Sequence, residues 1–248
     1  LWPFLDNKFA GQGIILSRVL HLRGIGESTV AELIDDLIVN QTNPTLAIYA
    51  RRGEIIIRIT AKAVDATAAT VMLDEGEAAL RERLEKYIYG VDDETLASYL
   101  GKKLLKQHKT ISFAESCTGG LASNLVTDIA GSSEYLIGSI VTYTNEAKHN
   151  LLKVKKETLN AYGAVSEETA LEMAQGVRKL FGSDFGVGIT GNAGPGGSEG
   201  KPVGLVYIAI ATPDEVYCKE FNFTSTRIEN KLRIALTAIS MVIDKLSE

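Results

Sequence analysis

The sequence predicts an α/β protein in two parts: a small α+β domain over residues 1–90, and an α/β domain over residues 91–248 with a mixed sheet flanked by helices. Strand-like and helix-like apolar patterns alternate along the second part, which is typical of α/β folds. A length of 248 residues, 45% of them hydrophobic, suffices for two domains with cores of their own. The segment Gly-Val-Asp-Asp at 90–93 has the composition of a linker.

The first part is predicted to form a β-α-β-β-α unit. Strands are expected at 13–22, 45–49 and 54–62, and helices after Gly26 (apolar face Val30, Leu33, Ile34, Leu37, Ile38) and at 66–89. Alternation of apolar and polar residues along 54–62 indicates a half-buried strand. Such a unit can resemble a KH-type RNA-binding module, but its nearest glycine loop, Gly24-Ile25-Gly26-Glu27, carries an acid. A structural spacer domain is the favoured interpretation.

The second part is predicted to alternate helices with strands. Helices are expected at 93–107, at 121–129, from about 145, at 167–181 and at the C-terminus, and strands at 110–114, 135–144, 185–190, 205–212 and 216–223. Ser166 is a candidate cap for the helix at 167. The last helix spaces its apolar residues by four and three: Ile228, Leu232, Ala235, Ile239, Val242 and Leu246.

The composition excludes several classes of function. A net charge of −5 provides no general basic field, so we expect no nucleic-acid partner. The two cysteines and three histidines show no metal-ligand spacing, and free cysteines favour a reducing, cytoplasmic setting. The longest strongly apolar run, 205–211, is too short to span a membrane. Since the chain begins with Leu1 and shows no signal-peptide pattern, we expect a fragment of a longer protein.

The most informative segment is AESCTGG at 114–120, between a predicted strand and a predicted helix. Small hydroxyl side chains and two glycines at a strand-to-helix turn can present a nucleophile, Ser116, above free backbone N–H groups. Cys117 ranks below Ser116 because consecutive side chains leave such a turn in different directions. An ordinary helix cap by Ser116 or Thr118 is an equal alternative on this segment alone.

A second candidate segment, VTYTNEAK at 141–148, runs from a strand end into a helix. It brings Tyr143 to the strand mouth and Lys148 about one turn into the helix, so both can face Ser116. A partly desolvated lysine loses its proton near neutral pH and can then accept the serine proton. Taken singly, Lys148 as a solvated helix lysine and Tyr143 as an ordinary strand-end aromatic are the simpler interpretations.

A glycine-rich loop at 190–202 follows another predicted strand. Its backbone N–H groups can approach an anion or a planar ring closely. Pro195 and Pro202 stand where a Walker A loop needs glycine and Ser or Thr, which disfavours ATP hydrolysis. The alternative is a long mobile hairpin connection, although loops of this length are often functional.

Together these segments resemble the CinA family, whose C-terminal domain is a nicotinamide mononucleotide deamidase. The matching segments are AESCTGG at 114–120, IAGSS at 129–133, VTYTNEAK at 141–148, GAVS at 163–166, GITGNAGP at 188–195 and KPVG at 201–204. Residues 1–90 resemble the KH-type middle domain of longer CinA proteins. The molybdopterin-binding-like domain that precedes it there is not expected here, nor is the pyrophosphatase activity linked to that domain.

The resemblance implies hydrolysis of the carboxamide of nicotinamide mononucleotide to nicotinate mononucleotide and ammonia, with no metal or other cofactor. It implies Ser116 as nucleophile, Lys148 as base and Tyr143 as third member. N–H groups near Thr118, Gly119 and Gly120 are expected to hold the oxyanion. The remaining implied substrate contacts are the hydroxyls of Ser133 and Thr190, the cation Arg227, and the loop glycines Gly191 and Gly194. Asn192 stands where the family usually has a small or apolar residue, which bears on substrate preference.

Two rival functions stay open at this point. One is a non-catalytic partner-binding role in DNA uptake or recombination on the same scaffold, against which the joint presence of Ser116, Tyr143 and Lys148 argues. The other is an amidase or esterase acting on a different nucleotide. We expect a pyridine nucleotide as the small-molecule partner and a homo-oligomer, with a dimer favoured.

Overall fold

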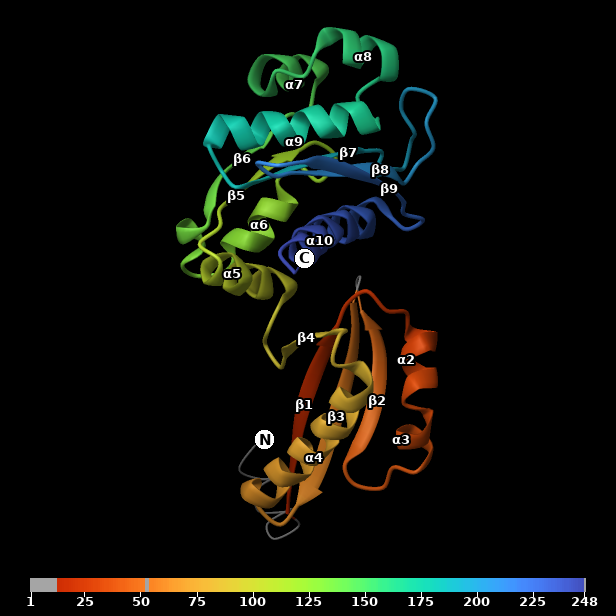
Figure 1. Cartoon of the computed structure of the whole chain (residues 1–248). Helices are drawn as coiled ribbons and strands as arrows, with labels where there is room; N and C mark the ends of the chain where they lie inside the picture. The colour runs from red at the N-terminus through yellow and green to blue at the C-terminus, as the bar shows by residue number, and fades with distance from the viewer. Residues whose placement is uncertain (1–12, 52–53, 248) are drawn as a thin grey trace, which may run out of the picture. The chain divides into compact units, whose positions relative to one another are not determined.

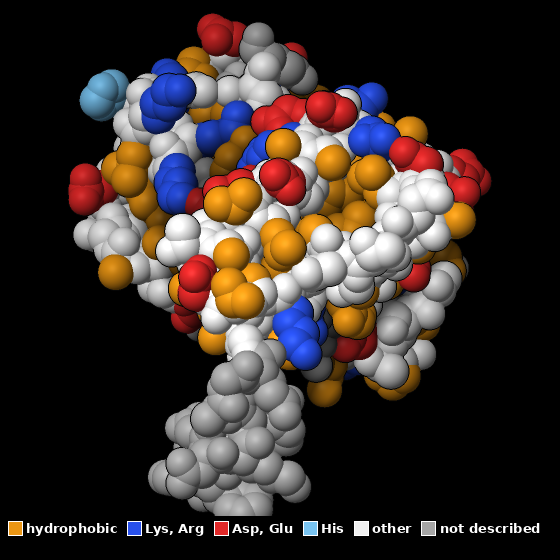
Figure 2. Space-filling view, turned by 90° about the horizontal axis from the view of Figure 1, so that it is seen from below, with side chains coloured by type: hydrophobic (Ala, Val, Ile, Leu, Met, Phe, Trp, Pro, Cys, Tyr) orange, Lys and Arg blue, Asp and Glu red, His pale blue; other side chains and the backbone are white. Residues whose placement is uncertain are grey.

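The computed structural model describes residues 13–51 and 54–247, and the first twelve residues of the predicted small domain lie outside this part. The chain divides into two compact units, Leu1–Thr95 and Leu96–Glu248 (Figure 1). Figure 2 shows a face on which Lys and Arg side chains are interspersed with Asp and Glu. In the described part of the chain, no helix has the length and apolar character needed to cross a bilayer.

The first unit is an antiparallel sheet of order β2-β3-β1-β4 with helices packed against it. Buried Leu20, Ile57 and Leu80 belong to its apolar core. Its elements are β1 (Ile14–Leu22), α2 (Glu27–Leu33), α3 (Asp35–Val39), β2 (Thr45–Arg51), β3 (Glu54–Ala63), α4 (Ala66–Leu84) and β4 (Ile88–Val91). The predicted β-α-β-β-α order is present, followed by an additional strand.

Two elements of the first unit differ from prediction. The single helix expected after Gly26 is broken at Ile34, whose backbone leaves the helical region, and Asp35 and Asp36 then favour the positive start of a new helix. The expected helix 66–89 ends at Leu84, because residues 88–91, partly assigned to the linker, pair with the free edge of β1 instead.

The second unit contains the predicted mixed sheet, of order β6-β5-β7-β8-β9, with β5 parallel to β6 and β7 and the other pairs antiparallel. Its strands are β5 (Ile111–Glu115), β6 (Leu136–Val141), β7 (Phe185–Gly191), β8 (Leu205–Ala211) and β9 (Val216–Asn222). Its helices are α5 (Leu96–Lys106), α6 (Leu121–Thr127), η1 (Ser132–Glu134), α7 (Asn145–Leu152), α8 (Lys156–Tyr162), α9 (Glu167–Phe181) and α10 (Arg227–Lys245). The short helix α8 was not predicted.

Helix α9 covers one face of this sheet, α6 and α10 cover the other, and α5 packs against α6 and α10 (Figure 1). Contact between α9 and β7 is unusually close, because a Cβ built on Gly188 would lie 2.4 Å from the carbonyl oxygen of Ala170. Strands β5, β6 and β7 run in the same direction, so their C-terminal ends meet at one edge of the sheet. The segments predicted to carry the chemistry follow directly from these three ends.

We expect Gly188→Ala to lower the free energy of unfolding of the second unit by about 1–3 kcal/mol, because the added methyl group meets helix backbone that cannot move alone. Chemical denaturation measures the change. Gly196→Ala is the matched control, since a Cβ there meets no described atom within 4 Å. Equal stability of the two variants would contradict the close contact between α9 and β7.

Candidate active site

The turn after β5 carries Ser116 to the C-terminal edge of the sheet. The Ser116 N–H donates to the carbonyl of Ile189 on β7 at 3.0 Å, and the Gly119 N–H donates back to the carbonyl of Ser116 at 3.1 Å. Gly119 and Gly120 have φ of +67° and +96°, a left-handed conformation that glycine adopts without strain. Gly120 is the N-cap of α6, and among the described residues neither Ser116 nor Thr118 accepts a hydrogen bond from the first turn of this helix, so the capping alternative for these two residues is wrong.

Glu115 is a residue of this turn that the sequence analysis missed. Its carboxylate is fully buried, and it accepts hydrogen bonds from the N–H groups of Gly120 (3.0 Å), Ala122 (3.1 Å) and Ser123 (2.8 Å) and from the Ser123 hydroxyl (2.8 Å). An anion at the first turn of α6 also interacts favourably with the helix dipole. An acidic residue at the end of a predicted strand, a few residues before the two glycines that start the helix, was the available signal.

The Glu115 contacts correct one expectation about the oxyanion site. The N–H of Gly120 is bound by Glu115, and the N–H of Gly119 is bound by the carbonyl of Ser116, so neither faces a substrate. Over residues 13–51 and 54–247, the N–H groups of Cys117 and Thr118 donate to no other residue. These two N–H groups, rather than those of the glycines, are the donors left at the nucleophile turn.

Lys148 meets Ser116 in the interior. Thr144 caps α7 by accepting a hydrogen bond from the Ala147 N–H at 3.1 Å, and this places Lys148 in the first turn. Its Nζ lies 3.0 Å from Ser116 Oγ and donates to the Thr142 carbonyl at 2.8 Å. Only 1% of Lys148 and 8% of Ser116 are exposed. The simple interpretation of Lys148 as a solvated helix lysine is therefore wrong.

Burial controls the ionisation of this pair. Burial lowers the pKa of Lys148 to about 8, against smaller opposing effects of Cys117 and Glu199. Burial also raises the pKa of the Cys117 thiol to about 12, so this thiol is uncharged near neutral pH. A neutral amine can accept a proton from a serine hydroxyl, whereas a neutral thiol is a poor nucleophile.

A cavity of about 260 Å³ opens beside this pair. It is enclosed by the segments that follow β5 and β6, by α7, β7 and the start of α10, and by the loop before α9 and the glycine-rich loop. It is lined by Ser116, Cys117, Tyr143, Lys148, Ala164, Val165, Thr190, Gly191, Asn192, Ala193, Gly194, Gly196, Ser198 and Arg227. Most of the residues predicted to form a site are thus gathered around one volume.

Tyr143 and Arg227 form a second contact at this cavity. Tyr143 is 61% exposed, and its hydroxyl accepts a hydrogen bond from Arg227 Nη2 at 3.2 Å. Arg227 begins α10 and also donates to the carbonyl of Gly194 in the glycine-rich loop. Tyr143 therefore lies next to the cation of the site, and among the described residues it makes no hydrogen bond to Ser116 or Lys148.

The remaining predicted residues have different surroundings. Thr190 is buried and donates to the carbonyl of Ala164 at 2.6 Å. Ser133 lies exposed in η1 and does not line the cavity in this chain. The Thr118 hydroxyl is buried without a described partner. In the described segments, no group of three His, Cys, Asp or Glu side chains is placed to hold a metal ion.

The fold and the site together define the second unit as an α/β domain with a buried serine–lysine pair at the edge of a mixed sheet. Family models agree with both units: residues 93–246 match the CinA C-terminal domain, and residues 17–90 match the KH domain of the damage-inducible protein CinA. The chain belongs to the CinA family.

Relatives and solved structures give the same result. A putative competence-damage inducible protein of Clostridium acetobutylicum is 47% identical over 93% of the chain, and a CinA-like protein of Prochlorococcus marinus is 44% identical over 98%. The chain spans 56% and 58% of their lengths. The structure of the competence/damage inducible protein CihA from Agrobacterium tumefaciens is 40% identical, with a TM-score of 0.58 over 62% of this chain and 98% of that one.

We expect Glu115→Gln to lower the free energy of unfolding by about 2–4 kcal/mol. Each carboxylate oxygen of Glu115 accepts two hydrogen bonds, so the NH2 group of a glutamine would face two donors in either orientation of its amide. Chemical denaturation measures this change. Glu134→Gln, at an exposed position of η1, is the control and should alter stability by less than about 0.5 kcal/mol. A Glu115→Gln protein as stable as the control would show that the carboxylate does not organise the turn.

Proposed function

We propose that the second unit hydrolyses the carboxamide of nicotinamide mononucleotide to nicotinate mononucleotide and ammonia. The observation that carries the reaction class is the distance of 3.0 Å between Lys148 Nζ and Ser116 Oγ in a buried site that opens on a cavity. A nucleophile in contact with a base is the usual signature of covalent acyl transfer. The choice of a pyridine nucleotide rests on the resemblance of the six quoted segments to the deamidase domain.

The proposed reaction proceeds through an acyl-enzyme. Neutral Lys148 takes the proton of Ser116, whose oxygen attacks the carboxamide carbon while the N–H groups of Cys117 and Thr118 stabilise the oxyanion. The Lys148 ammonium, held by the Thr142 carbonyl, then gives its proton to the leaving nitrogen, which departs as ammonia. Water deprotonated by Lys148 cleaves the ester, and the proton returns to Ser116.

We assign substrate recognition to residues of the cavity lining other than Ser116 and Lys148. The Arg227 guanidinium is suited to a phosphate group, and its hydrogen bond to the Tyr143 hydroxyl fixes its direction. We assign Tyr143 to the site as its third member through this contact. The peptide groups of Gly191 and Gly194 line the cavity and allow close approach of a flat ring.

Assay of ammonia release over a panel of pyridine compounds tests this proposal. Nicotinamide mononucleotide should be hydrolysed fastest, with the riboside, which lacks the phosphate, and the free amide far slower. Release from another amide alone would indicate a different amidase. Absence of release from every compound would favour the partner-binding role that the relatives' names, competence-damage inducible, suggest.

Ser116→Ala is expected to reduce turnover by more than about a hundredfold, since only binding and oxyanion effects then contribute to catalysis. The fold should persist, because the hydroxyl lies at the cavity surface rather than in a packed core. Steady-state ammonia release measures the loss, and calorimetric binding of the mononucleotide is the control. Retained activity in Ser116→Ala combined with loss in Cys117→Ala would identify the thiol as nucleophile.

Turnover should rise with pH through an inflection near 8, because Lys148 is protonated below its lowered pKa and accepts a proton only above it. Lys148→Arg should be nearly inactive at every pH, since a guanidinium keeps its proton in proteins. A pH–rate profile of parent and variant measures both effects. Near-parental turnover by Lys148→Arg would assign Lys148 a charge-supplying role and leave Tyr143 as the first candidate base.

A further inference from the structure

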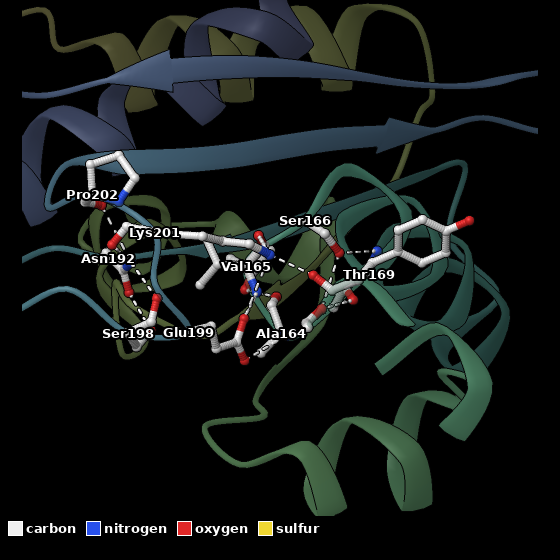
Figure 3. Close-up of polar contacts among 12 residues, drawn as sticks. Ala164, Val165, Ser166, Thr169, Asn192, Ser198, Glu199, Lys201 and Pro202 are labelled. Atoms are coloured by element: carbon white, nitrogen blue, oxygen red, sulfur yellow. Dashed lines mark hydrogen bonds and ion pairs between the residues drawn. The ribbon is translucent and has the colours of Figure 1, made fainter. Parts of the chain in front are cut away.

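The part of the glycine-rich loop that follows β7, residues 192–202, is ordered around one buried amide. Asn192 is 6% exposed, and its Oδ1 accepts a hydrogen bond from the Ser198 hydroxyl at 2.6 Å. Its Nδ2 lies 3.4, 3.2 and 3.3 Å from the carbonyl oxygens of Ser198, Lys201 and Pro202. Figure 3 shows this side chain between the two arms of the loop. Asn192 thus joins the start of this segment to its end.

Two charged side chains near the end of this loop bind the segment 162–165. Glu199 accepts hydrogen bonds from the N–H groups of Ala164 (2.8 Å) and Val165 (3.2 Å). Lys201 Nζ donates to the carbonyl oxygens of Val165 (2.6 Å) and Tyr162 and lies 3.7 Å from Glu199 (Figure 3). We call Glu199 and Lys201 the clasp.

The segment 162–165 depends on side chains for most of its polar contacts. Besides the clasp, Thr190 donates to the Ala164 carbonyl at 2.6 Å, and Ser166 and Thr169 donate to the Gly163 carbonyl at 3.1 and 2.8 Å. This stretch begins at Tyr162, the last residue of α8, precedes α9, and belongs to no described strand. Since buried peptide groups need partners, its conformation is determined by the side chains that supply them.

The backbone on both sides of this contact is adapted to the Glu199 carboxylate. A Cβ built on Gly163 would lie 2.2 Å from Glu199 Oε2, and φ of Gly163 is +81°, so the carboxylate occupies space that only glycine leaves free. Glu199 itself has φ of +57°, a conformation that is unfavourable for residues other than glycine and persists when the surroundings impose it.

We propose that the clasp residues Glu199 and Lys201 are positioning residues that hold the glycine-rich loop and the segment 162–165 together as one wall of the substrate cavity. Ala164 and Val165 on one side of the clasp and Gly194, Gly196 and Ser198 on the other all line the cavity of about 260 Å³. Loss of either clasp residue separates the two sides and weakens substrate binding. This proposal rests on the proposed function for the identity of the substrate.

The clasp also affects the chemistry of the pair through its charge. Burial alone would raise the pKa of Glu199, but the N–H groups of Ala164 and Val165 and the Lys201 ammonium hold it below its usual value. Glu199 is therefore an anion at neutral pH, and its charge favours the protonated form of Lys148. Removing this charge shifts the ionisation of Lys148 toward lower pH, an effect that a purely structural role would not produce.

Kinetics of Glu199→Gln and Lys201→Met test the proposal. Each variant should raise KM by roughly tenfold or more, because the cavity wall that binds the substrate in the ground state is lost. The kcat should stay within about threefold of the parent value, because the Ser116–Lys148 pair is kept. In Glu199→Gln the inflection of the pH–rate profile should also move to lower pH. Lys201→Arg keeps the charge and donor groups and should restore most of the affinity lost in Lys201→Met.

Asp184→Asn is the matched control. Asp184 directly precedes β7, whereas the loop that carries Glu199 follows the other end of this strand. Asp184 also accepts a backbone N–H, that of Thr110 at 2.9 Å, and lies 3.2 Å from Lys109, with an exposure of 29% against 31% for Glu199. This variant should lower stability comparably and leave KM and the pH profile unchanged. A tenfold rise of KM in the control as well would overturn the positioning role, as would an unchanged KM in both clasp variants.

Hydrogen exchange of the segment 162–166 gives a readout without substrate. Amides of Ala164 and Val165 should exchange faster in both clasp variants and at the parental rate in Asp184→Asn. If the parent hydrolyses no pyridine nucleotide, the proposed function fails and exchange alone decides the clasp. Unchanged exchange in both clasp variants would overturn the clasp even in a fully active enzyme.

Discussion

The burial of the Lys148 amine at the C-terminal edge of the sheet is the interaction on which the site depends. Its near neighbours are a serine hydroxyl and a peptide carbonyl, and both accept a hydrogen bond without supplying a full negative charge. An ammonium in such surroundings is disfavoured relative to the neutral amine. The fold therefore stabilises the neutral amine, which is a proton acceptor, next to Ser116 by limiting the solvation of the ammonium.

The buried carboxylate of Glu115 lies directly before Ser116 in the sequence, yet no ion pair joins it to Lys148 among the described residues. Four donors at the start of α6 satisfy the Glu115 carboxylate without a contribution from Lys148. A direct ion pair would favour the charged lysine and remove the base. Because each group has its own hydrogen-bond partners, one strand-to-helix turn can contain a buried carboxylate and also present a nucleophile to the Lys148 amine.

Much of the second unit could be predicted, because its strands and helices follow local periodicity and the ends of parallel strands meet at one edge. The same logic predicts that Lys148 can face Ser116. The additional strand at Ile88 and the break at Ile34 depend on a sheet edge and on packing, which local patterns do not contain. Ser133, implied only by resemblance, lies away from the cavity, and the contact of Glu199 with Ala164 spans 35 residues of sequence.

The close contact of β7 with α9 has a consequence for tolerance to change. At Gly186 and Gly188 the strand lies against the backbone of the helix with no intervening side chain. The spacing between Thr190, near the end of this strand, and Ala164, which precedes this helix, is therefore set by the dimensions of peptide groups. Because peptide groups set this spacing, the width of the cavity does not depend on the sizes of apolar side chains elsewhere in the core, which can change during evolution.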